Sequence, residues 1–423
     1  MAVSSTSDTL AAPAAPPRRG SRPREQDGAG RAVGRSPLAV VFLTVFLDLV
    51  GFGIVIPLLP LYAERFGAGP VAVTWLVAVY SLMQLLFAPW WGALSDRVGR
   101  RPVLLVGLFG SAASYLLFGL AGSLATLFVG RALAGLMGAN VGVAQAYIAD
   151  VTAPEERARG MGLIGAAFGL GFILGPAIGG ALSHLGHAAP FLGAAAVAAA
   201  NGLLALWRLP ESLPADRRDA RPAGAGPAAR LRALAAAAAN PRLRPLYAAS
   251  LLATLAIAAM EATLSLWADR RWGLSPAEVA FLFAYVGGVA VLVQGALVGR
   301  LARRLGERRL ALAGALALAA GLAAIPLAPS PWLLAAALAA FAFGQGTLTP
   351  ALSALVSRAA PVAEQGRLLG VSQSLSALGR VLGPVAGGVA FARLGIGAPY
   401  LAGAALALLA LLALAAGRAG GRA

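Results

Sequence analysis

Ionisable residues inside long apolar segments are the first candidates for chemistry in this chain. Asp48 lies within the run Leu47–Pro60, where a carboxylate is costly unless it meets a partner, a wet cavity or a proton. A carboxylate in that setting can bind and release a proton, so we predict that Asp48 carries one. Arg131, inside the segment Phe128–Gly138, is the candidate counter-charge. Two alternatives remain open: a structural hydrogen bond for Asp48 and a packing role for Arg131.

Glu261 and Arg380 are the other charges placed deep in apolar segments. Either they pair across two helices or each lines a cavity on its own, and the sequence favours neither. Uncharged polar residues in the same segments are candidate cavity liners or interhelical hydrogen-bonding groups: Gln84, Asn140, Gln145, Gln294, Gln345 and Gln373. Four aromatic residues offer either stacking to a planar ligand or ordinary packing: Tyr80, Tyr115, Tyr147 and Trp267.

Glycines at a four-residue spacing mark another apolar segment. Gly171, Gly175 and Gly179 fall on one helix face, which lets a second helix approach closely. Pro176 removes a backbone donor and permits a bend, and Gly180 completes the pattern. The pattern recurs 208 residues later, between Gly379 and Gly388. It is consistent with ordinary helix packing and with a moving seam between helices.

A charged loop, GALSDRVGRR, joins two apolar segments and has an altered copy 207 residues downstream. Its candidate gating residues are Gly92, Asp96, Arg97, Gly99, Arg100 and Arg101. An acidic group at a helix N-terminus is stabilised by the helix dipole and can pair with a nearby arginine. In the copy, Arg303 takes the place of Asp96, so a latch built on this carboxylate cannot be symmetric. A plain topological anchor is the alternative.

Membrane-spanning helices are required to position these residues. The chain is 59% hydrophobic and 12% charged, and apolar runs of about 20 residues, which suit a hydrocarbon core of about 30 Å, recur along it. We therefore predict an all-α polytopic membrane protein with twelve spans, at 37–59, 72–95, 102–121, 123–149, 157–182, 188–208, 245–268, 277–298, 309–327, 331–357, 366–390 and 398–416.

The arginines gather on one side of these predicted spans, the side that holds both termini. The opposite side carries only Arg65, Arg270, Arg271 and Arg393. This asymmetry is the positive-inside pattern, and it predicts that both termini are cytoplasmic. The net charge of +17 then reflects topology and attraction to anionic membrane lipid, and nucleic acid is not an expected partner.

The domain organisation follows from composition and repetition. We predict a disordered cytoplasmic tail at 1–36, a six-helix bundle at 37–208, a cytoplasmic linker at 209–244, a second bundle at 245–416 and a short tail at 417–423. The loop copy and the glycine copy keep nearly the same register over half the chain. Such repetition predicts two parallel structural repeats.

The sequence lacks the residues that several kinds of chemistry require. All 34 basic residues are arginine, and the chain has neither lysine nor cysteine, which removes a P-loop lysine, Schiff-base chemistry and thiol chemistry. The two histidines, His184 and His187, share one loop, and no cluster with metal-ligand spacing is present. We expect no metal, no cofactor and no enzymatic activity, because no nucleophile–base pair stands out.

The duplicated GxxxDRxGRR loop resembles the signature of the major facilitator superfamily of transporters. The pattern GxxxGPxxGG at Gly171–Gly180 is similar to the antiporter motif of its drug:proton exporters, and DLVGFGIVIPLLP at Asp48–Pro60 resembles the first span of the tetracycline-exporter-like branch. This resemblance implies two six-helix bundles. It also implies rocking-switch export of a small hydrophobic drug or metabolite, in exchange for protons, by a monomer in the bacterial inner membrane.

The resemblance assigns roles to single residues as well. It implies that Asp96 helps to latch the two halves on the cytoplasmic side and that Arg131 assists proton transfer. Tetracycline exporters carry acidic residues inside spans 3 and 9, where this sequence has Ser114 and Leu318. We therefore expect a substrate other than tetracycline. The alternative to export is uptake of a small nutrient, by proton symport or facilitated diffusion, which the antiporter motif disfavours.

Overall fold

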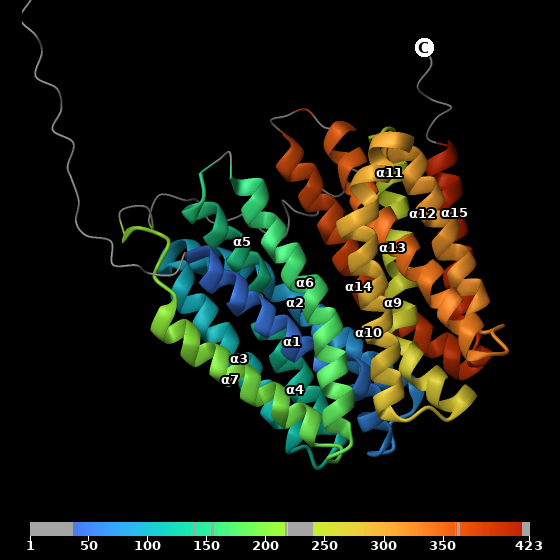
Figure 1. Cartoon of the computed structure of the whole chain (residues 1–423), viewed down its shortest axis with the longest axis horizontal. Helices are drawn as coiled ribbons and strands as arrows, with labels where there is room; N and C mark the ends of the chain where they lie inside the picture. Colours follow the sequence, from blue (N-terminus) through green and yellow to red (C-terminus); the bar gives the residue numbers. More distant parts are fainter. Residues whose placement is uncertain are drawn as a thin grey trace, which may run out of the picture. The chain divides into compact units, whose positions relative to one another are not determined.

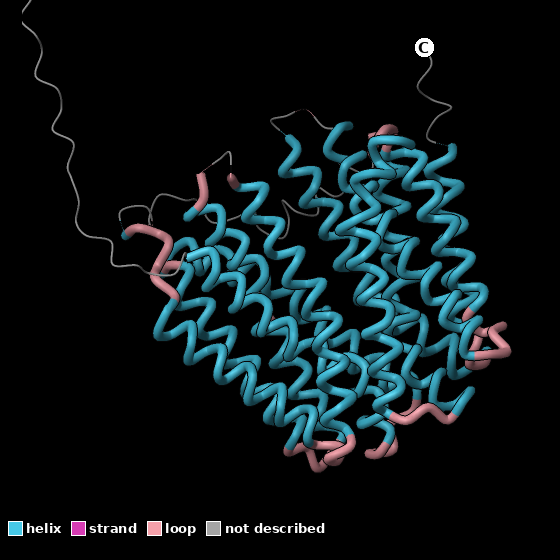
Figure 2. Tube along the Cα trace, viewed as in Figure 1, coloured by secondary structure: helices cyan, strands magenta, loops and turns pink. Residues whose placement is uncertain are grey.

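The computed structural model describes residues 37–138, 140–153, 156–215, 218, 240–359, 361 and 364–416. The predicted tails 1–36 and 417–423, and most of the predicted linker 209–244, lie outside the described residues. Across the described part the chain is helical, its loops lie at the helix ends, and it holds no strand (Figure 2).

The helices follow the predicted apolar segments closely. Those of the first half are α1 (Pro37–Glu64), α2 (Pro70–Val98), α3 (Arg100–Gly119), α4 (Leu124–Met137), α5 (Asn140–Val151), α6 (Arg157–Ser183) and α7 (Ala189–Arg208). Those of the second half are α9 (Arg244–Trp272), α10 (Pro276–Leu292), the π-helix η2 (Val293–Leu297), α11 (Val298–Leu305), α12 (Glu307–Ala324), α13 (Pro331–Ala359), α14 (Gln365–Leu394) and α15 (Ala398–Ala416).

Two groups of helices make up the described part (Figure 1). Helices α1 to α7, coloured blue to green, form one group and α9 to α15, coloured yellow to red, form the other, and between the groups α2 packs on α14 and α6 packs on α10. Eleven crossings among the described residues are long and apolar enough to span a membrane, with α4 and α5 forming one of them and α10 to α11 another. Helix α12, whose first turn is charged, packs on α13 and α15 as the twelfth. The predicted fold of two six-helix bundles is confirmed.

Two predicted spans are not single α-helices. The span predicted at 123–149 divides after α4, which Gly138 caps, and resumes as α5 at Asn140. A broken helix leaves carbonyl groups to be satisfied by neighbours, and here Nε2 of Gln84 donates to the carbonyl oxygen of Gly138 at 2.8 Å. The span predicted at 277–298 passes through the π-helix η2, which contains Gln294. Such π-segments often lie at functional places.

The two bundles meet at the end opposite the arginine-rich loops. Nη2 of Arg270 on α9 lies 3.0 Å from Oε1 of Glu64 on α1, and Oγ of Ser265 donates to the carbonyl oxygen of Pro57 at 2.8 Å. Gly388 on α14 lies directly against Thr74 on α2, which leaves no room there for a side chain. These contacts seal the molecule at one end.

Candidate transport site

Asp48 lies in a polar cluster inside the first bundle. Nδ2 of Asn140, at the start of α5, donates to Oδ2 of Asp48 at 3.4 Å. Tyr80 on α2 and Tyr115 on α3 are within electrostatic range of the same carboxylate. The predicted alternative of a structural partner is therefore realised in Asn140. A hydrogen bond of 3.4 Å is beyond the usual range, so it does not prevent the carboxylate from exchanging a proton.

Arg131 is buried beside this cluster. Its side chain is 2% exposed, and its Nε and Nη1 atoms are buried without a hydrogen-bond partner. Its guanidinium carbon lies 5.0 Å from the centre of the Tyr80 ring, a cation–π contact. No ion pair within 4.0 Å joins Arg131 to Asp48 or to any other described acid. Buried donors without partners are rare in native structures, so Arg131 is a strong candidate for a group that changes partner during function.

Glu261 and Arg380 lie on two neighbouring helices of the second bundle, α9 and α14. From Ala258 to Ala268 on α9, Glu261 is the one residue that is not buried. Arg380 on α14 is also exposed, and it is within electrostatic range of Tyr80 in the first bundle. No ion pair within 4.0 Å joins Glu261 and Arg380 in the described structure. Each of the two charges is within electrostatic range of the other, so both arrangements left open by the sequence stay open.

The packing of α9 against α14 explains why these two charges do not form a direct ion pair. The two helices run side by side in the same direction, since Gly379 packs on Thr254 and Gly387 packs on Ala259. Arg380 is thus level with residues near Leu255, six positions before Glu261. Six residues at 1.5 Å each separate the charges by about 9 Å along the helix axis. A ligand can therefore meet a carboxylate and a guanidinium at two depths.

The remaining polar and aromatic candidates divide between structural and exposed positions. Gln84 and Asn140 make the interhelical hydrogen bonds described above, Gln145, Gln294 and Gln373 are exposed, and Gln345 is half-buried. Tyr147 and Trp267 do not line the cavity. The hydroxyl of Tyr147 donates to the carbonyl oxygen of Pro210 at 2.9 Å, and the Trp267 ring packs on Tyr400 at 5.7 Å. Ordinary packing is the role of both aromatic residues.

The glycine pattern forms a close contact inside the first bundle. A Cβ atom on Gly175 would lie 2.7 Å from both the Gly53 Cα and the Val50 carbonyl oxygen on α1. Gly171 and Gly179, with Pro176 between them, continue this contact of α6 with α1. The copy in the second bundle is equally tight, because a Cβ on Gly383 would lie 2.7 Å from the Leu255 carbonyl oxygen.

Gly180 is the member of the pattern that contacts the other bundle, at α10. A Cβ atom at this position would lie 3.1 Å from the Ala280 Cβ and 3.2 Å from the Ala277 carbonyl oxygen, both on α10. The antiporter pattern therefore contains an intra-bundle face and, at its end, an inter-bundle contact.

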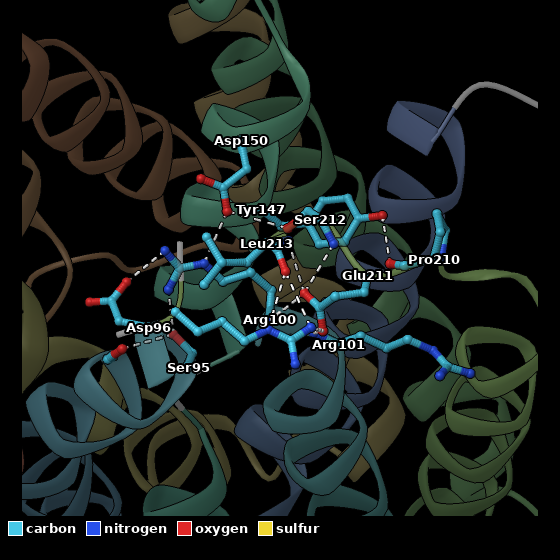
Figure 3. Close-up of polar contacts among 12 residues, drawn as sticks. Ser95, Asp96, Arg100, Arg101, Tyr147, Asp150, Pro210, Glu211, Ser212 and Leu213 are labelled. Atoms are coloured by element: carbon cyan, nitrogen blue, oxygen red, sulfur yellow. Dashed lines mark hydrogen bonds and ion pairs between the residues drawn. The ribbon is translucent and has the colours of Figure 1, made fainter. Parts of the chain in front are cut away.

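The first arginine-rich loop is organised around Arg100 (Figure 3). This side chain is 2% exposed, and its Nη2 lies 2.6 Å from Oδ1 of Asp96 while its Nε lies 3.1 Å from Oδ2 of Asp150. Its Nη1 donates to Oγ of Ser95 at 2.7 Å. The predicted pairing of Asp96 with an arginine of its own loop is thus present.

Glu211, just after α7, holds the start of α3 (Figure 3). Its carboxylate accepts hydrogen bonds from the backbone N–H groups of Arg100, at 2.8 Å, and Arg101, at 3.2 Å. The guanidinium of Arg101 donates to the Leu206 carbonyl oxygen at 2.6 Å. Gly99 has a φ of 106°, and a Cβ there would strike the Glu211 carboxylate, with Cδ 2.7 Å away. Glycine at position 99 is therefore required by both conformation and space.

The other two gating candidates are less constrained. Oγ of Ser95 donates to the Gly92 carbonyl oxygen at 2.8 Å, and Arg97 is exposed. The contacts that Arg100 and Arg101 make all remain within the first half of the chain. The expected latch between halves is not built from these contacts in the present conformation, which is sealed at the other end.

The second arginine-rich loop has the same backbone turn with different charges. Gly306 has a φ of 77°, and Arg308, at the position of Arg101, donates to the carbonyl oxygens of Leu414 and Ala415. Glu307, at the position of Arg100, forms an ion pair with Arg358. Arg358 corresponds in turn to Asp150, so the ion pair is present in both halves with its charges exchanged.

Sequence reasoning missed Glu211 and the importance of Asp150. Asp150 binds Arg100 and accepts from Ser212 Oγ at 3.3 Å. The sequence repeat contained a signal for the role of Asp150. Asp150 and Arg358 are 208 residues apart and opposite in charge, and Arg100 and Glu307 are 207 residues apart and also opposite in charge. No pattern pointed to Glu211, because its position depends on how the chain leaves α7.

Comparison with known proteins agrees with this geometry. The family model described as Major Facilitator Superfamily matches residues 41–298 and 247–419. The chain belongs to the major facilitator superfamily. It is 36% identical to the tetracycline resistance protein, class C, of Escherichia coli, over 82% of this chain and 88% of that protein. It is 30% identical to multidrug resistance protein 2 of Bacillus subtilis (strain 168), over 86% of this chain and 90% of the relative.

A solved structure gives the same picture for this major facilitator protein. The human organic anion transporter MFSD10 (TETRAN) superposes with a TM-score of 0.69 at 29% identity, covering 91% of this chain and 100% of that one. The chain is accordingly a multi-pass membrane transporter, as its drug-resistance relatives and its helix arrangement both indicate.

Proposed function

We propose that this transporter is a proton-coupled antiporter that exports a small, largely hydrophobic drug or metabolite across the bacterial cytoplasmic membrane. Both termini lie in the cytoplasm in this proposal, because the arginine-rich loops follow the positive-inside rule. The end sealed by Glu64 and Arg270 is then periplasmic. The present conformation therefore faces the cytoplasm, and substrate enters from there by alternating access.

The observation that carries the proposal is the division of charges between the bundles. Asp48, half-buried, and Arg131, buried, lie in the first bundle without forming an ion pair with each other, while Glu261 and Arg380 are exposed in the second. Tyr80 connects the two sets, being within electrostatic range of Asp48, Arg131 and Arg380. An exchanger needs a proton site and a substrate site that influence one another, and this arrangement of charges supports assigning Asp48 to the first and Glu261 with Arg380 to the second.

Proton transfer would proceed through Asp48. In the outward-facing state the carboxylate takes a proton from the periplasm. Arg131, which is buried without hydrogen-bond partners at Nε and Nη1, stabilises the ionised carboxylate when the two approach, and so promotes proton release to the cytoplasm. Substrate binding near Glu261 and Arg380 and protonation of Asp48 would then favour opposite conformations, which is the condition for exchange.

The substrate need not be tetracycline, although several relatives are tetracycline resistance proteins. Ser114 is fully buried and donates to the Gly110 carbonyl oxygen at 2.7 Å, and Leu318 is fully buried against Gly344. The places where we expected tetracycline exporters to carry acids are thus buried positions without charge here. This supports a substrate that needs no carboxylate at either depth.

Transport in everted membrane vesicles tests the proposal. A drug-susceptibility panel in an efflux-deficient bacterium first supplies a substrate, and vesicles with an acidified interior should then accumulate it. Adding substrate to energised vesicles should release protons measurably from the interior. Accumulation that persists after the proton gradient is collapsed would refute proton coupling, and transport only in the opposite direction would establish uptake.

A further inference from the structure

A cavity at the arginine-rich end of the second bundle has no role in the transport cycle described above. It holds about 250 Å³ and opens among α9, α12, α13 and α15. Three arginines line it, Arg242, Arg308 and Arg358, and no acidic residue does. Its remaining walls are largely apolar, formed by Pro245, Leu246, Leu355, Ala359 and Leu414.

The corresponding place in the first bundle is filled by protein. The counterparts of Arg308, Leu355, Arg358 and Leu414 are Arg101, Tyr147, Asp150 and Leu206. The segment Pro210–Leu213 lies over them, since Tyr147 donates to Pro210, Ser212 donates to Asp150, and the N–H groups of Arg100 and Arg101 donate to Glu211. An anionic group, the Glu211 carboxylate, thus occupies this place in the first half (Figure 3).

In the second half of the sequence the counterpart of Glu211 is Ala419, which carries no charge. Residues 415–423, which follow the counterpart of Leu206 in the sequence, contain no aspartate or glutamate. Glu307 offsets part of the charge by pairing with Arg358, but that guanidinium remains 70% exposed, and Nε of Arg308 is buried without a partner. Arg101 in the first half has the same unpartnered Nε, so this atom does not distinguish the halves, and the difference between them is the segment Pro210–Leu213 with its Glu211 carboxylate.

We infer that this cavity binds the phosphate headgroup of an anionic phospholipid. Guanidinium groups recognise phosphate oxygens through paired hydrogen bonds. Basic pockets between transmembrane helices are suited to such headgroups. The site lies at the ends of the spanning helices, where headgroups are abundant, and Leu246, Leu355 and Leu414 offer apolar contact to the glycerol and the first acyl carbons. The lipid phosphate takes the place that Glu211 has in the first half.

Lipid binding at this cavity also has a consequence for the second loop. Arg358 would be shared between the lipid phosphate and Glu307, and Arg308 would be held against the end of α15. The bound headgroup thereby stabilises the loop in the conformation seen here.

Lipid binding to the purified full-length protein tests this inference. Native mass spectrometry should detect one saturable phosphatidylglycerol in preference to phosphatidylcholine. Arg242→Gln, and more so the double variant Arg242→Gln/Arg358→Gln, should weaken that binding about tenfold. Arg304→Gln, an exposed arginine at the same end that does not line the cavity, is the control and should retain it.

Three results would overturn the assignment. One is an equal loss of binding in the Arg304→Gln control, which would indicate general surface charge. Another is displacement of the lipid by millimolar inorganic phosphate with retained affinity for phosphate alone, which would identify a free anion as the ligand. The third is a tenfold gain in lipid affinity on deletion of residues 417–423, which would identify this segment as the normal occupant.

Discussion

The two arginine-rich loops have the same backbone turn and opposite charges around it. In the first, Arg100 lies between Asp96 and Asp150 and is 2% exposed. In the second, Glu307 pairs with Arg358, and Arg303 takes the position of Asp96. Both loops share a glycine with positive φ, Gly99 or Gly306. Both also share an arginine that donates to backbone carbonyl oxygen near the end of the last helix of its bundle: Arg101 for α7 and Arg308 for α15.

The comparison distinguishes the residues that the turn requires from the charges that differ between the two halves. The glycine and the arginine at 101 or 308 secure the turn in both halves, so they serve the fold. The exchanged charges leave the first cluster with two acids and one base, and the second with one acid and two bases. In the proposed orientation and transport cycle, two clusters of opposite net charge would attract each other when the bundles close on the cytoplasmic side. The inversion therefore supports a latch that depends on the pair of loops and not on Asp96 alone.

The largest expected effect comes from removing the buried charge of the first loop. Arg100→Gln leaves Asp96 and Asp150 without their shared cation, and breaking a buried pair costs roughly 3–5 kcal/mol. Glu307→Gln breaks a pair whose arginine is 70% exposed, so about 0–1 kcal/mol is expected. Thermal unfolding in detergent, followed by tryptophan fluorescence, checks both. Equal destabilisation of the two variants would mean that the loops are energetically alike and would remove the basis of the comparison.

A loss of transport of about a hundredfold or more is the next prediction. Asp48→Asn keeps the shape of the side chain and its contact with Asn140 but cannot exchange a proton, so proton-driven efflux should fall by that factor, about 2.7 kcal/mol. Glu261→Gln should instead raise KM for substrate and keep coupling to the gradient. The check is efflux normalised to correctly inserted protein. Normal uphill transport by Asp48→Asn would show that Asp48 is structural and that the proton uses another group.

Sequence reasoning succeeded where a local pattern sets the structure. Apolar length predicted the spans, and the spacing of Gly171, Gly175 and Gly179 predicted that a second helix approaches closely, because each depends on residues near one another in the chain. The structure identifies that helix as α1. It failed to find Glu211 and did not anticipate that Arg131 would stack on Tyr80 without reaching Asp48. Those contacts depend on how helices rotate against one another, which no local spacing fixes.

The glycine faces allow a second comparison between the halves, with an intermediate effect. Gly175→Ala places a methyl group 2.7 Å from the Gly53 Cα and the Val50 carbonyl oxygen, where only main chain can yield, at a cost of roughly 1–3 kcal/mol. The methyl of Gly383→Ala meets the Leu255 carbonyl oxygen at 2.7 Å and the Ala258 Cβ at 3.0 Å, so stability should fall similarly. Transport per folded molecule should fall about tenfold in Gly175→Ala only.

That difference would locate a moving contact in the first bundle. If both alanine variants transport normally once expression is taken into account, then the face is static packing and the antiporter motif loses its mechanistic meaning here. If both lose transport equally, the two halves move alike and the asymmetry is confined to the loops.

The smallest effect is expected at Asp96 and Arg303, which occupy corresponding positions in the two arginine-rich loops. Asp96 is 32% exposed and supports Arg100 at 2.6 Å, while Asp150 supports the same guanidinium from the other side. Asp96→Asn therefore leaves Arg100 partly paired and should slow turnover by about fivefold, close to 1 kcal/mol. Arg303→Gln, an exposed residue of the second loop, should change turnover by less than twofold, because surface changes usually stay within about 0.5 kcal/mol.

Steady-state kcat and KM in proteoliposomes separate the possibilities: a latch lowers kcat and spares KM, whereas a raised KM in Asp96→Asn would place this carboxylate in substrate binding. A loss in Arg303→Gln as large as that in Asp96→Asn would mean that the exposed arginine of the second loop contributes as much to closure as the first-loop carboxylate does, and the latch would then have to be assigned equally to both halves.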